Sequence, residues 1–393
     1  MSDSYQPEDV VVYNERSLKK LIRSITNSQG HFALILARCN YCSLRDQMVQ
    51  QIKEECQVEI RELHLSKSIK TLYTTIEANL GNQLPQALMI FDLELVDAID
   101  QLLISTNQVR EEFRKNFQFP IVIWVNDPTF QKLIQLMPDF KSWTGNSIKF
   151  KIATNQLINN LHQIVNSLFT AILNVGAGKF LDNAYLNLDL GILHLGEIES
   201  AVRDLQISIE KLEPELEASL QFLLGREADA NGHKSEAKNY YEQSIAVWEK
   251  KVKNKHNVSS DDLKRYGCLL WHLGFWWEQY AILHRSEYYE ACLKAKDYFQ
   301  KCVEGFRQHK YPDLAAKFIN AWGEVLTRLE AWDELEKVAL VAIELHQTYP
   351  EPIRLGYSYG FMAEVVLKKS QWIEAKEYAE LALETNAKIS LEK

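Results

Sequence analysis

The first 150 residues alternate between short apolar runs and longer segments with helical spacing. Three runs are almost entirely apolar, as is typical of strands buried on both faces of a parallel sheet: Phe32–Ala37, Ala87–Asp92 and Ile121–Val125. A fourth run, Val58–Leu65, largely alternates apolar and polar positions. Helical periodicity marks the segments between and ahead of them: Ser17–Asn27, Leu44–Cys56, Ile69–Leu80 and Val96–Phe117. Strands alternating with helices predict an α/β domain with a parallel sheet and right-handed crossovers.

From about residue 183 the pattern changes to a helical repeat in which one position, usually small, recurs in a fixed place. This position falls at Ala201, Ala237, Ala295, Leu335 and Ala375, so that successive copies lie 36, 58, 40 and 40 residues apart. The first copy is the weakest, with Tyr185, Leu188, Ile192, Gly196 and Leu205 as its other members. Five ordered copies favour an all-α solenoid of stacked helix pairs. A generic helical bundle is the alternative.

These two patterns predict three parts of the chain. We place the α/β domain at residues 1–155, a connecting helix and linker at 156–182, and the helical repeats at 183–393. The connecting part combines an apolar helix, Leu157–Leu173, with the segment Gly176-Ala177-Gly178-Lys179, which we interpret as a flexible break.

Composition and charge narrow the class of protein. The chain has 44 Lys and Arg against 53 Asp and Glu, for a net charge of −9. Residues 1–175 contribute −1 and the remainder −8, so neither part has the basic excess of a phosphate-backbone binder. Six cysteines without the spacing of a disulfide framework, no charged-then-apolar leader and no apolar run of about 18 residues indicate a cytoplasmic protein with reduced thiols and no membrane partner.

Three motifs in the first part resemble those of additional-strand P-loop ATPases, specifically the STAND and AAA+-like modules that precede tetratricopeptide repeats in bacterial signalling and conflict proteins. Leu88–Glu94 has the form of a Walker B strand, and Asn126 follows the strand Ile121–Val125 where those folds place a sensor residue. Met137–Trp143 resembles a Pro-Asp-x-x-x-Trp stretch common after that strand. The resemblance covers roughly residues 15–150 and implies a P-loop-like fold.

The chain departs from that family at the phosphate-binding loop. A Walker A loop needs glycines whose amides cradle phosphate, a lysine that neutralises charge and a hydroxyl for magnesium. The residues after the first strand, Arg38–Arg45, contain neither glycine nor lysine. Gly178-Lys179 does not replace them, because Phe180 stands where Ser or Thr is required. We therefore predict a degenerate P-loop-like domain without NTP hydrolysis or cofactor; weak nucleotide binding through Arg38 or Arg45 remains an alternative.

Other residues with possible chemistry have simpler interpretations. Cys39 and Cys42 have the spacing of a zinc or thiol-exchange pair, but no second pair accompanies them, so ordinary reduced cysteines are favoured. Asp92, Glu94, Asp97 and Asp100 could bind magnesium, although carboxylates also suit the start of a helix. No metal-binding histidine pattern or nucleophile elbow is present. We predict no catalytic, cofactor-binding or metal-binding residue.

The repeat part resembles the tetratricopeptide family over about Asn183–Lys388. Its second copy carries the family pattern best, with Leu224, Gly225, Gly232, Ala237 and Tyr241. In that family the first helix of each pair lines a concave groove, and this resemblance implies a partner-binding set that includes Phe222, Arg226, Trp271, Phe275, Lys317, Asn320, Arg328, Tyr357 and Lys368, with Asn183 and Glu278 beside them. The Arg, Lys and Asn side chains of this set can donate hydrogen bonds, and its aromatic rings offer flat apolar surfaces. Such a set within an acidic domain suits an extended or helical peptide with an acidic group, such as a C-terminal carboxylate.

The favoured hypothesis is a non-catalytic adaptor or scaffold that binds a protein partner through the array, in a bacterial signalling or defence assembly. The alternative is a nucleotide-responsive regulator in which residual NTP binding changes how the array is presented. An enzyme using Asp92 and Glu94 with a metal ranks last. An array without a polar capping helix would leave apolar surface for a partner or a second copy, so oligomerisation is possible.

Overall fold

The structure is a computed structural model that describes residues 7–81, 84–177, 195–207, 212–254 and 258–391. Two compact units form, one from residues 1–161 with 190–212 and the other from 162–189 with 213–393. Each is described by itself. Asn183, Tyr185, Leu188 and Ile192 of the weak first repeat copy lie outside the described residues, as do Gly178 and Lys179 of the expected flexible break.

The first unit is built on a parallel sheet, as the sequence predicts. Its strands are β1 (Ala33–Arg38), β2 (Ile60–His64), β3 (Ala87–Phe91), β4 (Pro120–Val125) and β5 (Ile148–Lys149). They lie in the order β2-β3-β4-β1-β5, and every neighbouring pair is parallel. The two-residue strand β5 was not predicted, because so short a run carries no periodicity.

The helices of this unit are α1 (Pro7–Asn27), α2 (Cys42–Glu55), α3 (Leu72–Leu80), α4 (Ile99–Gln108), α5 (Arg110–Asn116), α6 (Asp127–Leu136) and α7 (Pro138–Ser142), with a 3-10 turn at Leu93–Leu95. The single helix predicted at Val96–Phe117 is wrong, since the chain leaves helical geometry at Val109 (φ −99°, ψ 16°) between α4 and α5. Asn126, expected as a sensor residue, caps α6, where its side-chain oxygen accepts from the backbone N–H of Thr129 at 2.8 Å.

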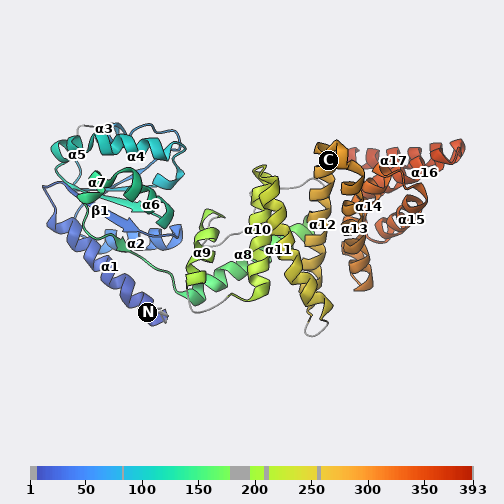
Figure 1. The fold of residues 1–393 in the computed structure, drawn as a ribbon, viewed down its shortest axis with the longest axis horizontal. Coiled ribbons are helices and arrows are strands. Elements are labelled where there is room, and N and C mark those ends of the chain that lie inside the picture. The colour runs from blue at the N-terminus through green and yellow to red at the C-terminus, as the bar shows by residue number, and fades with distance from the viewer. Residues whose placement is uncertain (1–6, 82–83, 178–194, 208–211, 255–257, 392–393) are drawn as a thin grey trace. The chain divides into compact units, whose positions relative to one another are not determined.

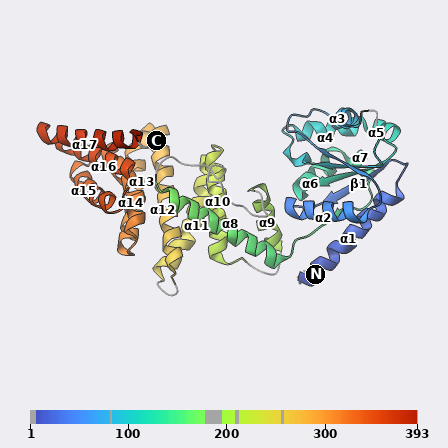
Figure 2. The same ribbon diagram turned by 180° about the vertical axis from the view of Figure 1, so that it is seen from behind.

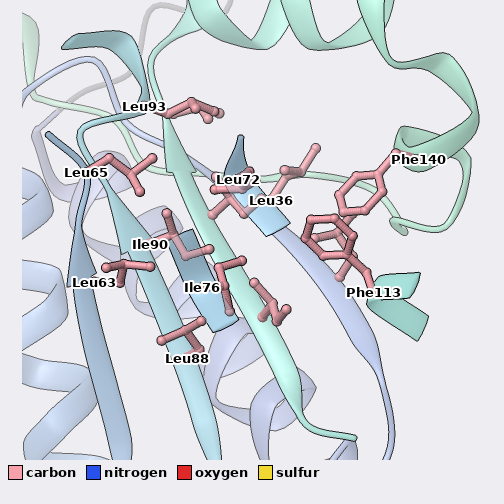
Figure 3. Packing of buried hydrophobic residues seen from close by; sticks show 14 of the residues in the cluster. Leu36, Leu63, Leu65, Leu72, Ile76, Leu88, Ile90, Leu93, Phe113 and Phe140 are labelled. Atoms are coloured by element: carbon pink, nitrogen blue, oxygen red, sulfur yellow. The ribbon is translucent and has the colours of Figure 1, made fainter. Parts of the chain in front are cut away.

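One large apolar cluster of the first unit lies on the face of the sheet shown in Figure 3. Leu36, Leu63, Leu88 and Ile90 extend from the strands toward apolar side chains of the covering helices, among them Phe113. Every residue of β3 and β4 is buried, which explains why both strands are apolar throughout. Polar residues follow the carboxyl ends of β3 and β4. Because the strands are parallel, their carboxyl ends lie along the same edge of the sheet.

The second unit is helical. After α8 (Thr154–Val175), whose residues from 162 onward belong here, come α10 (Pro214–Ala230), α11 (Lys234–Lys253), α12 (Ser260–Leu283), α13 (Tyr288–Gln308), α14 (Pro312–Arg328), α15 (Trp332–Thr348), α16 (Pro352–Lys368) and α17 (Trp372–Leu391), with a 3-10 turn at Arg285–Glu287. Each helix from α10 to α16 contacts the next along the chain, and α14 also contacts both α12 and α16 (Figure 1). Among the described helices, none has the length and apolar character to cross a membrane.

Small residues in this unit face large rings of neighbouring helices. A Cβ added to Gly225 would lie 2.8 Å from the ring of Tyr241, and one added to Gly274 would lie 2.6 Å from the ring of Phe299. The recurrent positions Ala237, Ala295 and Leu335 have no exposed surface. The repeated small positions of the sequence are therefore places where helices approach closely.

One helix belongs to a different unit from the one predicted. α9 (Leu195–Ile207), which carries the recurrent position Ala201, belongs to the first unit and not to the series of helices that follows it.

Candidate functional site

The carboxyl edge of the sheet is the first candidate, because open α/β sheets bind ligands beyond the carboxyl ends of their strands. Arg38 ends β1, Asp92 follows β3 directly, and Asp127 lies two residues after the end of β4. In a P-loop fold, the loop after the first strand holds phosphate. Each of these charged groups already has a partner within the unit.

Asp127 is the centre of a charged network at this edge. Its Oδ1 accepts from Arg38 Nε at 3.1 Å and Nη2 at 2.7 Å, and its Oδ2 accepts from Lys149 Nζ at 2.8 Å. Asn40 donates to Oδ2 at 3.2 Å and accepts from the backbone N–H of Asp127 at 2.8 Å. Burial alone would raise the pKa of Asp127, but the hydrogen bonds from Lys149 and Arg38 outweigh it, and the pKa is lowered. Asp127 is therefore ionised and holds both cations.

Asp92 is the centre of a second group of charged side chains at this edge. Its backbone has left-handed geometry, with a φ of 66°. Its carboxylate lies 3.3 Å from Arg45 Nη1 and 2.7 Å from His64 Nδ1. Arg45 also lies 3.7 Å from Glu94, whose pKa burial raises. The structure brings Asp92 and Glu94 together around Arg45, whereas Asp100 pairs with Lys132 at 2.7 Å on the surface. Within the described ranges, no three His, Cys, Asp or Glu side chains are grouped to hold a metal ion.

The loop between β1 and α2 is filled by carboxylates from α9. Asp204 Oδ2 accepts from the Tyr41 hydroxyl at 2.7 Å and from Asn40 Nδ2 at 3.2 Å. Glu197 Oε1 accepts from the backbone N–H of Cys42, the first residue of α2, at 2.6 Å. A helix N-terminus favours anions, and here the chain supplies its own. Sequence reasoning missed both acidic residues, because their helix has the periodicity of a repeat copy.

The cysteine pair at this edge is held in the thiol form. Cys39 Sγ donates to the carbonyl of Tyr41 at 3.2 Å, and burial raises the pKa of Cys39 to about 12. Burial, together with the neighbouring Glu197, also raises the pKa of Cys42. Thiol exchange requires a thiolate, so this geometry agrees with the interpretation of the pair as ordinary reduced cysteines.

The second candidate is the predicted partner-binding set on α10, α12, α14 and α16. Four of its members are buried: Phe222, Arg226, Trp271 and Asn320. Their contacts lie inside the unit. Arg226 contacts His272 Nε2, and Asn320 donates to the carbonyl of Arg354 at 2.9 Å. A partner cannot reach these buried side chains in this arrangement.

The remaining members are half-buried or exposed. Phe275 is half-buried and stacks on Trp271, with ring centroids 5.6 Å apart. Lys317, also half-buried, donates to the last carbonyls of α8. Tyr357 is 57% exposed, and Lys368 is exposed with its Nζ 5.0 Å from the centre of the Trp332 ring. These two keep surface that a partner can contact.

Arg328 is paired with a carboxylate that was assigned to the same groove. Its Nη2 lies 3.1 Å from Glu278 Oε1, and Glu278 is buried. Burial raises the pKa of Glu278 to about 7, although Arg328 opposes this shift. The charge of Arg328 is thus partly offset by its own neighbour.

A shallow hollow of about 410 Å³ lies elsewhere on the unit. Its lining residues come from α11, α12 and α13: Glu242, Trp277, Leu293, Lys294, Asp297 and Tyr298. Lys294 Nζ lies 4.1 Å from the centre of the Trp277 ring, so the aromatic face is already covered by a cation. Nothing in the sequence pattern predicts this hollow.

Comparison with known proteins does not assign the chain to a family. No protein-family model matches it, and no curated protein matches it. Among solved structures, the crystal structure of BtubC (BKLC) from P. vanneervenii is similar over 61% of this chain and 93% of that chain, with a TM-score of 0.42 and 15% sequence identity. A similarity this distant carries no argument about function.

Proposed function

We propose that this chain is a non-catalytic adaptor, in which a degenerate P-loop-like domain accompanies a tetratricopeptide-like array that binds a protein partner. Its setting would be a bacterial signalling or defence assembly, as the family resemblance implies. The observation that carries the proposal is the hydrogen bond from the Cys42 backbone N–H to Glu197 at 2.6 Å. The place where a P-loop would hold phosphate holds a carboxylate of the chain itself.

The fold supports both halves of the resemblance. The strand order inserts β4 between β1 and β3, as expected of a P-loop domain with an additional strand. In the helical unit, glycines of α10 and α12 meet rings of α11 and α13, which supports a tetratricopeptide-like packing of helix pairs. Repeats of this kind act by recognition through an extended surface.

A nucleotide-responsive regulator has less support. Arg38 and Arg45, the cations nearest to a nucleotide phosphate in that hypothesis, already pair with Asp127 and Asp92. A nucleotide would have to break these pairs and also displace Glu197 from α2. Desolvating and separating paired charges costs several kcal/mol per ion in the interior. An enzyme using Asp92 and Glu94 has less support still, because Arg45 already lies between them.

Calorimetric titration of ATP, ADP and GTP with magnesium tests the non-catalytic assignment. We expect no heat of binding at about millimolar nucleotide, which corresponds to at most about −4 kcal/mol of binding free energy. The double variant Glu197→Ala, Asp204→Ala removes the internal carboxylates and is titrated beside the wild type. Micromolar binding by the wild type refutes the proposal. Binding by the double variant alone would favour a regulator whose site is masked by α9.

Affinity capture with the full chain tests the partner-binding assignment. The variant Tyr357→Ala, Lys368→Ala alters the exposed members of the predicted set on α16. Tyr289→Ala on α13 is the matched control, because Tyr289 is 62% exposed and Tyr357 is 57% exposed. We expect captured proteins to be lost with the first variant and retained with the control. Equal capture by both would contradict binding through this surface.

A further inference from the structure

Glu278 of α12 is a buried carboxylate with an unsatisfied oxygen. Its side chain is only 6% exposed, and among the described residues its Oε1 accepts no hydrogen bond. Arg328 Nη2 lies 3.1 Å from Oε1, which is close enough for an ion pair but is not aligned for a hydrogen bond. Buried polar atoms nearly always have a hydrogen-bond partner. This oxygen therefore lacks a donor that a ligand can supply.

The charges around this carboxylate come from three helices, α12, α13 and α14, which pack side by side (Figure 2). Helix α14 contributes Arg328 and, one turn before it, a second carboxylate, Glu324. Helix α13 contributes Tyr288 and Cys292 beside Arg328, and desolvation raises the pKa of both, so both are neutral near pH 7. A single guanidinium is thus shared by two carboxylates.

One shared cation does not balance this cluster. Burial raises the pKa of Glu278 to about 7 and Glu324 adds to the shift, although the charge of Arg328 opposes it. Desolvation raises the pKa of Glu324 as well. Asp127 in the first unit shows the opposite result, because it accepts hydrogen bonds from two cations and its pKa is lowered. A second cation is what the Glu278 cluster lacks.

Glu278 lies on a face of α12 that the family resemblance assigns to a partner. Phe275 and Trp271 precede it by one and two turns, so the three residues share one helical face. Phe275 is half-buried, and Arg328 has a side chain that is 36% exposed and can move into solvent. A metal ion would need a third ligand, and within the described ranges no three His, Cys, Asp or Glu side chains are grouped to hold one.

We propose that Glu278 and Glu324 form a cation-binding subsite of the array, which takes a Lys or Arg side chain of the protein partner. The inference rests on the proposed adaptor function and names the partner's chemistry at one position. The partner's N–H groups donate to Glu278 Oε1, Arg328 turns toward Glu324, and the aliphatic part of the partner's side chain packs on Phe275. The net charge of −8 on residues 176–393 favours the same partner charge. This charge is opposite to that of the acidic peptide expected from the sequence.

Selection from a phage-displayed library of random 12-residue peptides tests the subsite. The full chain and Glu278→Gln serve as baits in parallel, because Gln keeps the shape of the side chain and removes its charge. We expect Arg and Lys together to be enriched at least about threefold over the starting library on the wild type and not on Glu278→Gln. Glu344→Gln, at an exposed residue of α15, is the matched control and should keep the enrichment.

The charge requirement is then measured on one selected peptide. Its Arg is replaced by citrulline, which is nearly isosteric and neutral, and a selected Lys by acetyl-lysine. By fluorescence anisotropy at pH 8, the cationic peptide should bind the wild type about three- to tenfold more tightly than the neutral one, and Glu278→Gln should remove the difference. Because the cation favours ionised Glu278, affinity for the cationic peptide should fall about tenfold from pH 8 to pH 6, whereas affinity for the neutral peptide should change little.

Arg328→Gln shows which charge meets the partner. Without the competing guanidinium, both carboxylates are open to the peptide, so the cationic peptide should bind at pH 8 at least as tightly as it binds the wild type. Weaker binding would mean that Arg328 itself contacts the partner, and it would overturn the subsite. Circular dichroism checks the helix content of each variant. Glu324→Gln, at an exposed residue, is the second variant should Glu278→Gln not fold, and it should reduce the preference for the cation.

The outcomes separate this inference from the adaptor function. Peptides selected without enrichment of Arg or Lys, or with enrichment that persists on Glu278→Gln, overturn the subsite and leave the adaptor function standing. Equal affinities for the cationic and the neutral peptide have the same consequence. If the wild type selects no peptide at all, the result counts against the adaptor function, and the subsite is refuted with it.

Discussion

The close contact between Gly274 of α12 and Phe299 of α13 gives a prediction whose sign can be worked out from distances. A Cβ at residue 274 would lie 2.6 Å from Cε1 and 2.7 Å from Cδ1 of the ring, whereas ordinary contacts lie at 3.4–4 Å. Phe299 is 1% exposed, so its ring is enclosed by neighbouring side chains. Overpacking of this kind costs about 1–3 kcal/mol, and the better helix propensity of alanine returns about 1 kcal/mol. Gly274→Ala is therefore expected to destabilise the helical unit by up to about 2 kcal/mol.

Gly360→Ala on α16 is the matched control. A Cβ at residue 360 meets no heavy atom within 4 Å, so only the propensity gain of about 0.5–1 kcal/mol remains and the variant should be more stable. For a unit of this size, 1 kcal/mol shifts the melting temperature by about 2–4 °C. Thermal unfolding followed by tryptophan fluorescence, with Trp271, Trp276 and Trp277 on α12 as reporters, should show shifts of opposite sign.

The double variant Gly274→Ala, Phe299→Leu separates crowding from other effects. A smaller side chain at residue 299 makes room for the added methyl group, so the cost of Gly274→Ala should be smaller in the Phe299→Leu background than in the wild type. If Gly274→Ala were as stable as Gly360→Ala, the small residue would not be required by the packing of α12 on α13. The reading of the repeat as a pattern of close helix contacts would then be refuted.

Two further predictions concern buried polar groups. Burial lowers the pKa of His346 and of His272, and the nearby charge of Arg226 lowers that of His272 further. Both histidines therefore bind protons more readily in the unfolded chain than in the folded one. Their contribution to the free energy of unfolding is complete above about pH 6.5 and decreases below it, by at most about 1.4 kcal/mol per pH unit for each histidine. When the urea unfolding midpoint is plotted against pH, its slope below about pH 6.5 should be smaller in His346→Gln than in the wild type. An unchanged slope would show that His346 does not contribute to the pH dependence. Asp127→Asn removes the charged partner of two cations and should lower the free energy of unfolding in urea by about 1–3 kcal/mol. The control Asp46→Asn, at a side chain that is 67% exposed, should lower it by no more than about 1 kcal/mol. Equal losses would show that the Asp127 network contributes little to stability.

The sequence by itself predicted four of the five strands of the first unit and their parallel arrangement, whereas β5 and the helices α6 and α7 were not predicted. Strands β3 and β4 are apolar at every position because both of their faces are covered, and such continuous apolar runs can be recognised in the sequence alone. Gly225, a small residue of the second repeat copy, lies where two helices approach closely. The break between α4 and α5 at Val109 escaped prediction, because one residue outside helical geometry leaves the apolar periodicity nearly intact.

Only the tertiary structure decided what occupies each candidate site. Glu197 and Asp204 lie about 160 residues beyond the loop that they fill, and their helix reads as another repeat copy. The family resemblance assigned the groove residues, but a sequence pattern cannot distinguish a ring that faces solvent from one that faces α8, as Phe222 does. Local pattern fixes which face of a helix is apolar, whereas the partner of that face depends on contacts between residues distant in the chain.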